Sequence, residues 1–139
     1  MDVKIDIPNI KEMELVIRHV NEYMLDDEQL EREQFVIAKS NNTLVGFGRL
    51  RTHSDCIELC TLGVVTEYRG KGVGKKLVAE LIYRASSTLY LVCVIPKFFE
   101  KFNFEIVEDV PSSIIRKYEI CTTKLKVDEP YYMMRLEKK

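Results

Sequence analysis

The spacing of the apolar residues changes at Phe35. Between residues 10 and 24 apolar side chains recur every three or four positions, which predicts an amphipathic helix. Asn9 followed by Glu12 is typical of a capping box at the start of such a helix. From Phe35 onward the apolar runs are short and end at turn residues, as strands do. We expect three consecutive antiparallel strands, over residues 35–38, 44–51 and 56–65.

The second half of the chain alternates between helical and extended patterns. Apolar residues on one face predict a helix over residues 72–86, directly after a glycine-rich stretch. The nearly unbroken apolar run at 89–95 indicates a strand buried on both faces and parallel to the strand before the helix. The remaining elements expected are a short helix from Pro96, a strand over 104–107, a helix capped by Ser112 or Ser113 and covering 114–118, a loop over 121–130 and a strand over 131–136.

Length and composition narrow the class of protein. A chain of 139 residues with a formal charge of −1 and 31% charged residues is typical of one globular α/β domain when combined with this pattern of elements. The charge balance argues against binding to DNA or RNA, which favours a basic excess. No apolar run reaches the roughly 20 residues of a membrane span, and the N-terminus lacks the pattern of a secretory signal. We therefore expect a cytoplasmic protein.

The cysteines and histidines predict no metal site. The four cysteines form no CxxC pair, and two histidines in the whole chain complete no recognisable set of zinc ligands. We expect reduced thiols at Cys56, Cys60, Cys93 and Cys121.

The glycine-rich stretch at residues 69–74 carries the strongest indication of chemistry. It lies between a predicted strand and a predicted helix, where successive backbone N–H groups and a helix N-terminus favour an anion. Its glycines let a ligand approach the backbone closely. Positive charge is added by Arg69, Lys71, Lys75 and Lys76. We predict that this loop binds a phosphate group.

Two familiar phosphate loops do not fit this stretch. A Walker loop has four residues between its glycines and a Ser or Thr after its lysine, whereas only three residues separate Gly70 from Gly74 and a second lysine follows Lys75. A dinucleotide loop reads GxGxxG, whereas these glycines read GxGxG and follow antiparallel strands. The spacing therefore argues against ATP and NAD as ligands.

The stretch resembles the acyl-CoA loop of the GNAT superfamily of N-acetyltransferases, whose pattern is Arg/Gln-x-x-Gly-x-Gly/Ala. Arg69, Gly72 and Gly74 fit that pattern. Residues 62–68 are similar to the family's strand and approach to the loop, and Phe-Phe-Glu-Lys-Phe-Asn-Phe at 98–104 resembles its Phe-Tyr-Glu-Lys-x-Gly-Phe segment. The order of elements agrees over nearly the whole chain. The resemblance implies the GNAT fold and transfer of an acetyl group from acetyl-CoA to an amine.

The resemblance also implies where acetyl-CoA binds. In that family the strand before the loop bulges and splays from its parallel neighbour, and the pantetheine arm enters the opening. Backbone groups of the strand contact pantetheine, N–H groups of the loop hold the pyrophosphate, and the short helix after residue 95 faces the cofactor. The positions implied here are Leu62, Gly63, Val64, Arg69, Gly70, Lys71, Gly72, Val73, Gly74, Lys75, Phe98, Phe99 and Lys101.

Glu58 is the candidate base that deprotonates the acceptor amine. It lies eleven residues before Arg69, where histone-type members of the superfamily carry a glutamate base, and it is acidic in an otherwise apolar strand. The alternative interpretation is an exposed residue on an edge strand. Phe99 stands where many members carry a Tyr that protonates the departing CoA thiolate, so the general acid is left unassigned.

The sequence does not decide which amine accepts the acetyl group. The C-terminal segment is similar to small amino-acid N-acetyltransferases of the N-acetylglutamate synthase type. Arg49 and Arg51 share one face of a predicted strand and are candidates to hold a substrate carboxylate, the alternative being that both are solvent-side residues. The other acceptors considered are a protein or peptide, a polyamine and an aminoglycoside. An alternative function, from a different class of protein, is a non-catalytic module that binds acyl-CoA. A homodimer is also left open.

Overall fold

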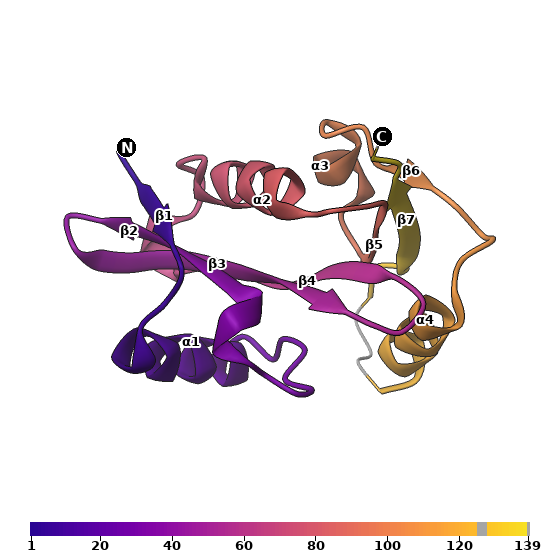
Figure 1. The fold of residues 1–139 in the computed structure, drawn as a ribbon, viewed down its shortest axis with the longest axis horizontal. Helices are drawn as coiled ribbons and strands as arrows, with labels where there is room; N and C mark the ends of the chain where they lie inside the picture. Colours follow the sequence, from indigo (N-terminus) through magenta and orange to yellow (C-terminus); the bar gives the residue numbers. More distant parts are fainter. Residues whose placement is uncertain (125–127, 139) are drawn as a thin grey trace. The chain divides into compact units, whose positions relative to one another are not determined.

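The computed structural model describes residues 1–124 and 128–138, and its elements follow the predicted order (Figure 1). The strands are β1 (Lys4–Asp6), β2 (Phe35–Ser40), β3 (Thr43–Thr52), β4 (Ile57–Val64), β5 (Leu89–Cys93), β6 (Glu105–Ile106) and β7 (Tyr132–Leu136). The helices are α1 (Ile10–Glu22), α2 (Val73–Arg84), α3 (Pro96–Glu100) and α4 (Ser112–Lys124), with short 3₁₀ turns η1 (Arg32–Gln34) and η2 (Thr66–Tyr68).

The strands pair in the order β1-β2-β3-β4-β5-β7-β6. The pairs β1–β2, β2–β3, β5–β7 and β6–β7 are antiparallel, and β4–β5 is parallel. This is the predicted mixed α/β fold. The chain divides into two compact units, of which the first contains Met1–Leu50 and Leu59–Arg84, and the second contains Arg51–Glu58 and the described residues from Ala85 onward. β4 therefore contributes residues to both units.

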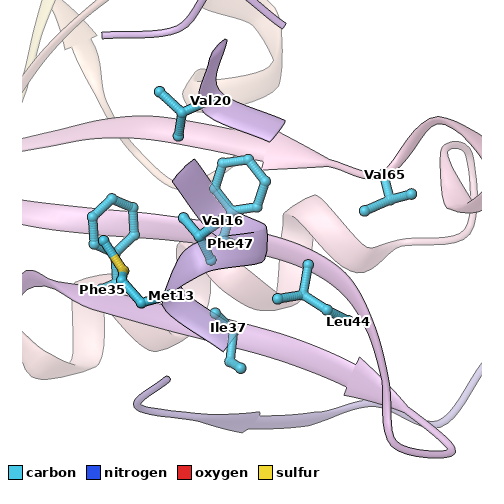
Figure 2. Close-up of a cluster of buried hydrophobic side chains, with 8 residues drawn as sticks. All are labelled: Met13, Val16, Val20, Phe35, Ile37, Leu44, Phe47 and Val65. Atoms are coloured by element: carbon cyan, nitrogen blue, oxygen red, sulfur yellow. The ribbon is translucent and has the colours of Figure 1, made fainter. Parts of the chain in front are cut away.

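The first unit has its core between α1 and the strands. Asn9 accepts a hydrogen bond from the Glu12 backbone N–H at 2.8 Å and donates its own N–H to the Glu12 carboxylate at 2.9 Å, so the predicted capping box is confirmed. One face of α1 then packs on β2 and β3, as Figure 2 shows. The buried apolar residues of this cluster are Met13, Val16, Val20, Phe35, Ile37, Leu44, Phe47 and Val65.

The opposite face of β3 receives α2. A β-carbon placed on Gly46 would lie 2.8 Å from Val73 Cγ1 and 2.9 Å from Leu77 Cδ1, so only a glycine lets α2 approach this closely. The next residue, Phe47, belongs to the α1 cluster. Because successive side chains of a strand point to opposite faces, α1 and α2 lie on the two sides of β3. This packing fixes the start of α2, and with it the loop at 69–74.

The second unit is built on β5. Ile57 and Glu58 of β4 pair in parallel with Leu89 and Tyr90, and β7 pairs along the other edge. Helix α4 packs against β5 and β7. Burial alternates along β5, with Tyr90 and Val92 half-buried, so the expectation of a strand buried on both faces is only partly met. Among the described residues no helix is long and apolar enough to cross a membrane.

The main difference from the predicted elements is the length of α4. The helix continues to Lys124, so the prediction of a loop from 121 is wrong for residues 121–124, and residues 125–127 lie outside the described residues. Two threonines near this end weaken the helical pattern, but both hydroxyls donate to the Glu119 carbonyl, at 3.1 Å from Thr122 and 2.7 Å from Thr123. The buried side chain of Cys121 fixes this last turn.

Candidate functional site

The loop at 69–74 adopts the conformation that its glycines allow. Gly70 has φ of 79° and Gly72 has φ of 83°, in the left-handed region that other residues rarely enter. A β-carbon on either would meet no atom within 4 Å. The glycines are therefore required by backbone conformation rather than by packing against the protein.

The loop ends at the N-terminus of α2. The Gly72 carbonyl accepts the Lys76 N–H at 3.2 Å, which closes the first turn of the helix. The N–H groups at the start of a helix have no acceptor within the helix, and they carry the positive end of its dipole. The loop thus has the backbone geometry that suits an anion, and phosphate binding at this position stays a prediction.

Side chains brace this loop from the protein side. Arg69 Nε donates to the Val64 carbonyl at 3.0 Å, and its guanidinium lies 4.9 Å from the centre of the Tyr23 ring. The Thr66 N–H donates to the Tyr23 hydroxyl at 3.1 Å. Lys71, Lys75 and Lys76 are all exposed, and Lys76 Nζ donates to the Met1 carbonyl at 3.0 Å. Arg69 thus has a structural contact at the position where a cofactor contact is predicted.

The end of β4 leads into this loop. A β-carbon on Gly63 would lie 2.5 Å from Phe47 Cζ, so this position has no room for a side chain. Leu62 and Val64, on either side, are half-buried. Upstream, Thr61 has φ of 53°, which is rare for a β-branched residue and typical of a bulge inside a strand. The sequence resemblance implies such a bulge in this strand.

Glu58 is buried in the second unit and has a partner on each carboxylate oxygen. Its side chain is 1% exposed. Oε1 lies 2.8 Å from His53 Nε2, and Oε2 lies 2.7 Å from Lys117 Nζ. The alternative of an exposed edge residue is therefore wrong. The arrangement places a carboxylate beside two groups that can hold or release protons.

Neither partner of Glu58 was predicted from the sequence. His53 lies five residues earlier, at the turn between β3 and β4, where the His53 N–H donates to the Cys56 carbonyl at 2.8 Å. His53 could have been suspected as a partner, because it is a histidine close in sequence to the candidate base. Lys117 lies 59 residues later, on α4. No local pattern indicates that pair.

A second contact fixes α4 beside the β3–β4 turn. The Ser113 N–H, in the first turn of α4, donates to Asp55 Oδ2 at 3.1 Å, so a side chain from outside the helix satisfies one of its first N–H groups. The cap predicted at Ser112 or Ser113 stays a prediction. Hydrogen bonds from Ser113 lower the pKa of Asp55. Ser113 and Lys117 are four positions apart and therefore lie on one face of α4. That face holds both Asp55 and Glu58.

Arg49 lies in the first unit and is enclosed by protein acceptors. Its side chain is 0% exposed and packs over the Phe35 ring, 5.7 Å from the ring centre. We therefore assign Arg49 a structural role and propose no substrate contact for it. Arg51 is also buried. The acceptors around Arg49 are the Thr61 hydroxyl at 2.8 Å, Gln34 Oε1 at 2.9 Å, the Gln29 carbonyl at 3.2 Å, the Asp26 carbonyl at 3.4 Å and Asp26 Oδ1 at 3.5 Å.

The short helix α3 presents a mixture of buried and open side chains. Phe99 is 5% exposed and makes edge-to-face contacts with Phe98 and Phe104, with ring centres 5.0 and 5.8 Å apart. Phe98 is half-buried, and Lys101 is exposed. Asn103 has φ of 73° and ends the helix segment, as predicted. Phe99 is therefore held mainly by its aromatic neighbours.

All four cysteines are free thiols. Burial raises the pKa of Cys56 to about 12, with the negative charge of Asp55 as the next cause. Burial raises the pKa of Cys93 to about 11. Both side chains are thus protonated near neutral pH and are weak nucleophiles.

The comparisons with known proteins identify the class to which this loop and fold belong. Residues 6–104 match the Acetyltransferase (GNAT) family model. The chain belongs to this family, and the predicted membership and fold are confirmed. No curated protein sequence matches it significantly.

Solved structures show the same fold at low sequence identity. Rv2747 from Mycobacterium tuberculosis, solved with CoA, aligns with a TM-score of 0.77 and 18% identity over 98% of this chain and 99% of its own. N-acetylglutamate synthase from Neisseria gonorrhoeae, solved with coenzyme A and N-acetyl-glutamate, aligns with a TM-score of 0.75 and 18% identity over 99% of this chain. The present chain spans 35% of that synthase. Arabidopsis thaliana Naa50, in complex with the bisubstrate analogue CoA-Ac-MVNAL, aligns with a TM-score of 0.68 and 20% identity over 99% of this chain and 100% of its own.

Proposed function

We propose that this chain transfers an acetyl group from acetyl-CoA to a primary amine by direct attack of the amine on the thioester. The observation that carries the proposal is the order of features along one segment. The buried carboxylate of Glu58 and the irregular Thr61 lie on β4, and this strand is followed by a loop that has two left-handed glycines and ends at the N-terminus of α2. Membership of the GNAT family supports this interpretation.

The loop at 69–74 and the first turn of α2 hold the pyrophosphate of acetyl-CoA in this proposal. The left-handed glycines leave their backbone open on the ligand side, and the exposed Lys71 and Lys75 supply positive charge. Backbone groups at Leu62, Gly63 and Val64 contact pantetheine. The Val64 carbonyl already accepts Arg69, but a carbonyl oxygen has two lone pairs. Phe98 and Lys101 stay predicted cofactor contacts.

Glu58 acts as the general base in this proposal. A primary alkylamine is largely protonated at neutral pH and must lose a proton before it can attack. Glu58 accepts that proton. His53, on the other carboxylate oxygen and with a side chain 16% exposed, passes it toward solvent.

Transfer is direct rather than through an acyl-cysteine. Cys56 and Cys93, whose pKa values are raised to about 12 and about 11, hold almost no thiolate near neutral pH. The departing CoA thiolate needs no side-chain acid, because a thiol with a pKa near 8.5 gives a tolerable leaving group. This agrees with Phe99, whose ring has no proton to donate.

A free amino acid is the acceptor that we place first. The N-acetylglutamate synthase neighbour was solved with N-acetyl-glutamate. A peptide N-terminus comes second, because Naa50 was solved with a bisubstrate analogue that contains a peptide. Arg51 stays a predicted contact for an acceptor carboxylate. Four free thiols also suit the reducing conditions of the cytoplasm, where we place this protein.

The experiment is a CoA-release screen with acetyl-CoA and a panel of amino acids, polyamines and short peptides, combined with calorimetry of acetyl-CoA binding. We expect micromolar-range binding and release that depends on one class of amine. Binding without release in every case would favour the second candidate, a non-catalytic acyl-CoA-binding module, which Phe99 in place of Tyr suggests. Absence of binding would overturn the proposed function.

A further inference from the structure

The partner of Glu58 on α4 is itself a primary amine. Lys117 Nζ lies 2.7 Å from Glu58 Oε2, within the distance at which a general base takes a proton. The Lys117 side chain is 17% exposed, whereas that of Glu58 is 1% exposed. The amine therefore contacts the buried base while part of its side chain stays open to solvent.

The surroundings hold this amine in place. The Asp55 carboxylate fixes the first turn of α4 through the Ser113 N–H at 3.1 Å, one helical turn before Lys117. His53 occupies the other oxygen of Glu58 at 2.8 Å, so the carboxylate is held from both sides. A reactant that is positioned beside its base needs little further ordering before it reacts.

An ordinary stabilising ion pair does not require this placement. Lys39 and Glu12 form a pair of similar length, 2.8 Å, but the Glu12 carboxylate keeps contact with water, its side chain being 18% exposed. The Glu58–Lys117 pair instead removes a carboxylate from water almost completely, which is costly and gains little stability over apolar packing. This cost favours a chemical role for the pair.

We propose that Lys117 is an acetylation site of the protein itself, modified within the same molecule by acetyl-CoA when no external amine is present. The proposal rests on the proposed function, in which Glu58 is the base and acetyl-CoA the donor. It adds to that function an acceptor that belongs to the chain.

The reaction balances without a further reactant. The Lys117 ammonium gives one proton to Glu58, and the nitrogen lone pair attacks the thioester carbonyl carbon. A nitrogen–carbon bond forms, the carbon–sulfur bond breaks, and its electron pair leaves with the CoA thiolate. The nitrogen then loses a second proton. One of the two protons converts the thiolate to CoA thiol, and the other reaches solvent through Glu58 and His53. Acetylation removes the positive charge beside Glu58.

The test is incubation of the full chain with isotopically labelled acetyl-CoA and no acceptor, followed by peptide mass spectrometry over time. We expect Lys117 to be labelled at least tenfold faster than Lys124, an exposed lysine of the same helix that reports uncatalysed labelling. The labelled fraction of Lys117 should grow at the same rate at low and high protein concentration. Glu58→Gln should reduce Lys117 labelling to the rate of Lys124.

Lys117→Arg keeps a cation beside Glu58 and removes the acceptor, so it should lose the label while Lys124→Arg keeps it. The proposal is overturned if Lys117 and Lys124 are labelled equally, if Glu58→Gln changes nothing, or if the rate rises with protein concentration, since that requires a second molecule. CoA release with an external amine but no label at Lys117 overturns this inference and leaves the proposed function intact. Failure to bind acetyl-CoA overturns both.

Discussion

Arg49 and Glu58 are two fully buried charges on successive strands, and their surroundings differ in kind. Around Arg49 the acceptors are a hydroxyl, a side-chain amide, two backbone carbonyls and one carboxylate, Asp26. Of these, only the Asp26 side chain is an ionisable group. The partners of Glu58, His53 and Lys117, are both ionisable nitrogen bases. The first cluster is suited to hold a loop in place, and the second is suited to move a proton.

The neighbours of a buried charge decide whether it serves structure or chemistry. A guanidinium does not deprotonate in proteins, so burial at Arg49 serves structure as long as its N–H groups are matched. A carboxylate with two titratable neighbours can change its protonation state without leaving any of them unpaired.

Arg49→Met should cause the largest change in stability. It removes the buried guanidinium from its pair with the Asp26 carboxylate, and breaking a buried ion pair costs about 3–5 kcal/mol. Urea unfolding should show this loss. The control is Arg84→Met, which removes a surface pair with Glu80 at 2.6 Å and should cost less than about 1 kcal/mol. If the two variants are equally stable and only Arg49→Met binds the acceptor more weakly, Arg49 contacts the substrate and its role is not structural.

Glu58→Gln should lower turnover by roughly 10²-fold or more, because the amide cannot accept the amine proton. Acetyl-CoA affinity should change little. Raising the pH should restore part of the rate, since more acceptor is then present as free amine. Glu80→Gln, which changes the pair with Arg84 on α2, is the matched control and should leave turnover unchanged. A normal pH–rate curve for Glu58→Gln would mean that another group, or water, accepts the amine proton.

Substitutions in the glycine loop should weaken acetyl-CoA binding by at least about tenfold, ~1.4 kcal/mol. Gly72→Val forces a β-branched residue to a φ of 83°, and Gly74→Val places a side chain in the first turn of α2. Gly72→Asn should lose less, because Asn enters the left-handed region more readily. Calorimetry separates these cases. Unchanged acetyl-CoA affinity in both valine variants would mean that the loop does not bind the cofactor.

Phe99→Tyr should leave binding intact and raise turnover modestly or not at all. The ring is enclosed by Phe98 and Phe104, so a new hydroxyl joins an aromatic cluster and not a proton path. Phe102→Tyr, on a ring that also contacts Phe98, is the control. Steady-state CoA release measures the effect. A change from undetectable to substantial turnover would mean that the natural chain is a binding module.

The smallest effect concerns acid and Asp55. The folded pKa of Asp55 is below its usual value of 3.8, through hydrogen bonds from Ser113. The contact therefore stabilises the folded chain above about pH 4 and is lost as the pH falls through the folded pKa. Asp55→Asn should unfold at a slightly lower temperature at neutral pH and show a shallower acid dependence. Identical acid profiles for the two proteins would mean that Asp55 does not hold α4.

Local patterns predicted most of the fold and part of the site. The capping box at Asn9 and the conformation of the glycine loop each depend on residues close in sequence, and the structure has both. Strand alternation placed Arg49 and Arg51 on one face but gave no sign of what covers that face. Acceptors at residues 26–34, brought over β3 by the chain between α1 and β2, satisfy Arg49. Glu58 and Lys117 are 59 positions apart, and no periodic pattern in the sequence predicts a contact between residues so distant.

The central claim is that this chain moves an acetyl group from CoA to an amine with Glu58 as the base. The most direct measurement follows released CoA thiol and labelled N-acetyl product in parallel, in wild type and in Glu58→Gln at saturating acetyl-CoA. We predict equal amounts of both products in wild type, growing together, and at least about a hundredfold less of each in the variant. Acetyl-CoA that binds but is never consumed with any amine, or product formed equally well by Glu58→Gln, would contradict the claim.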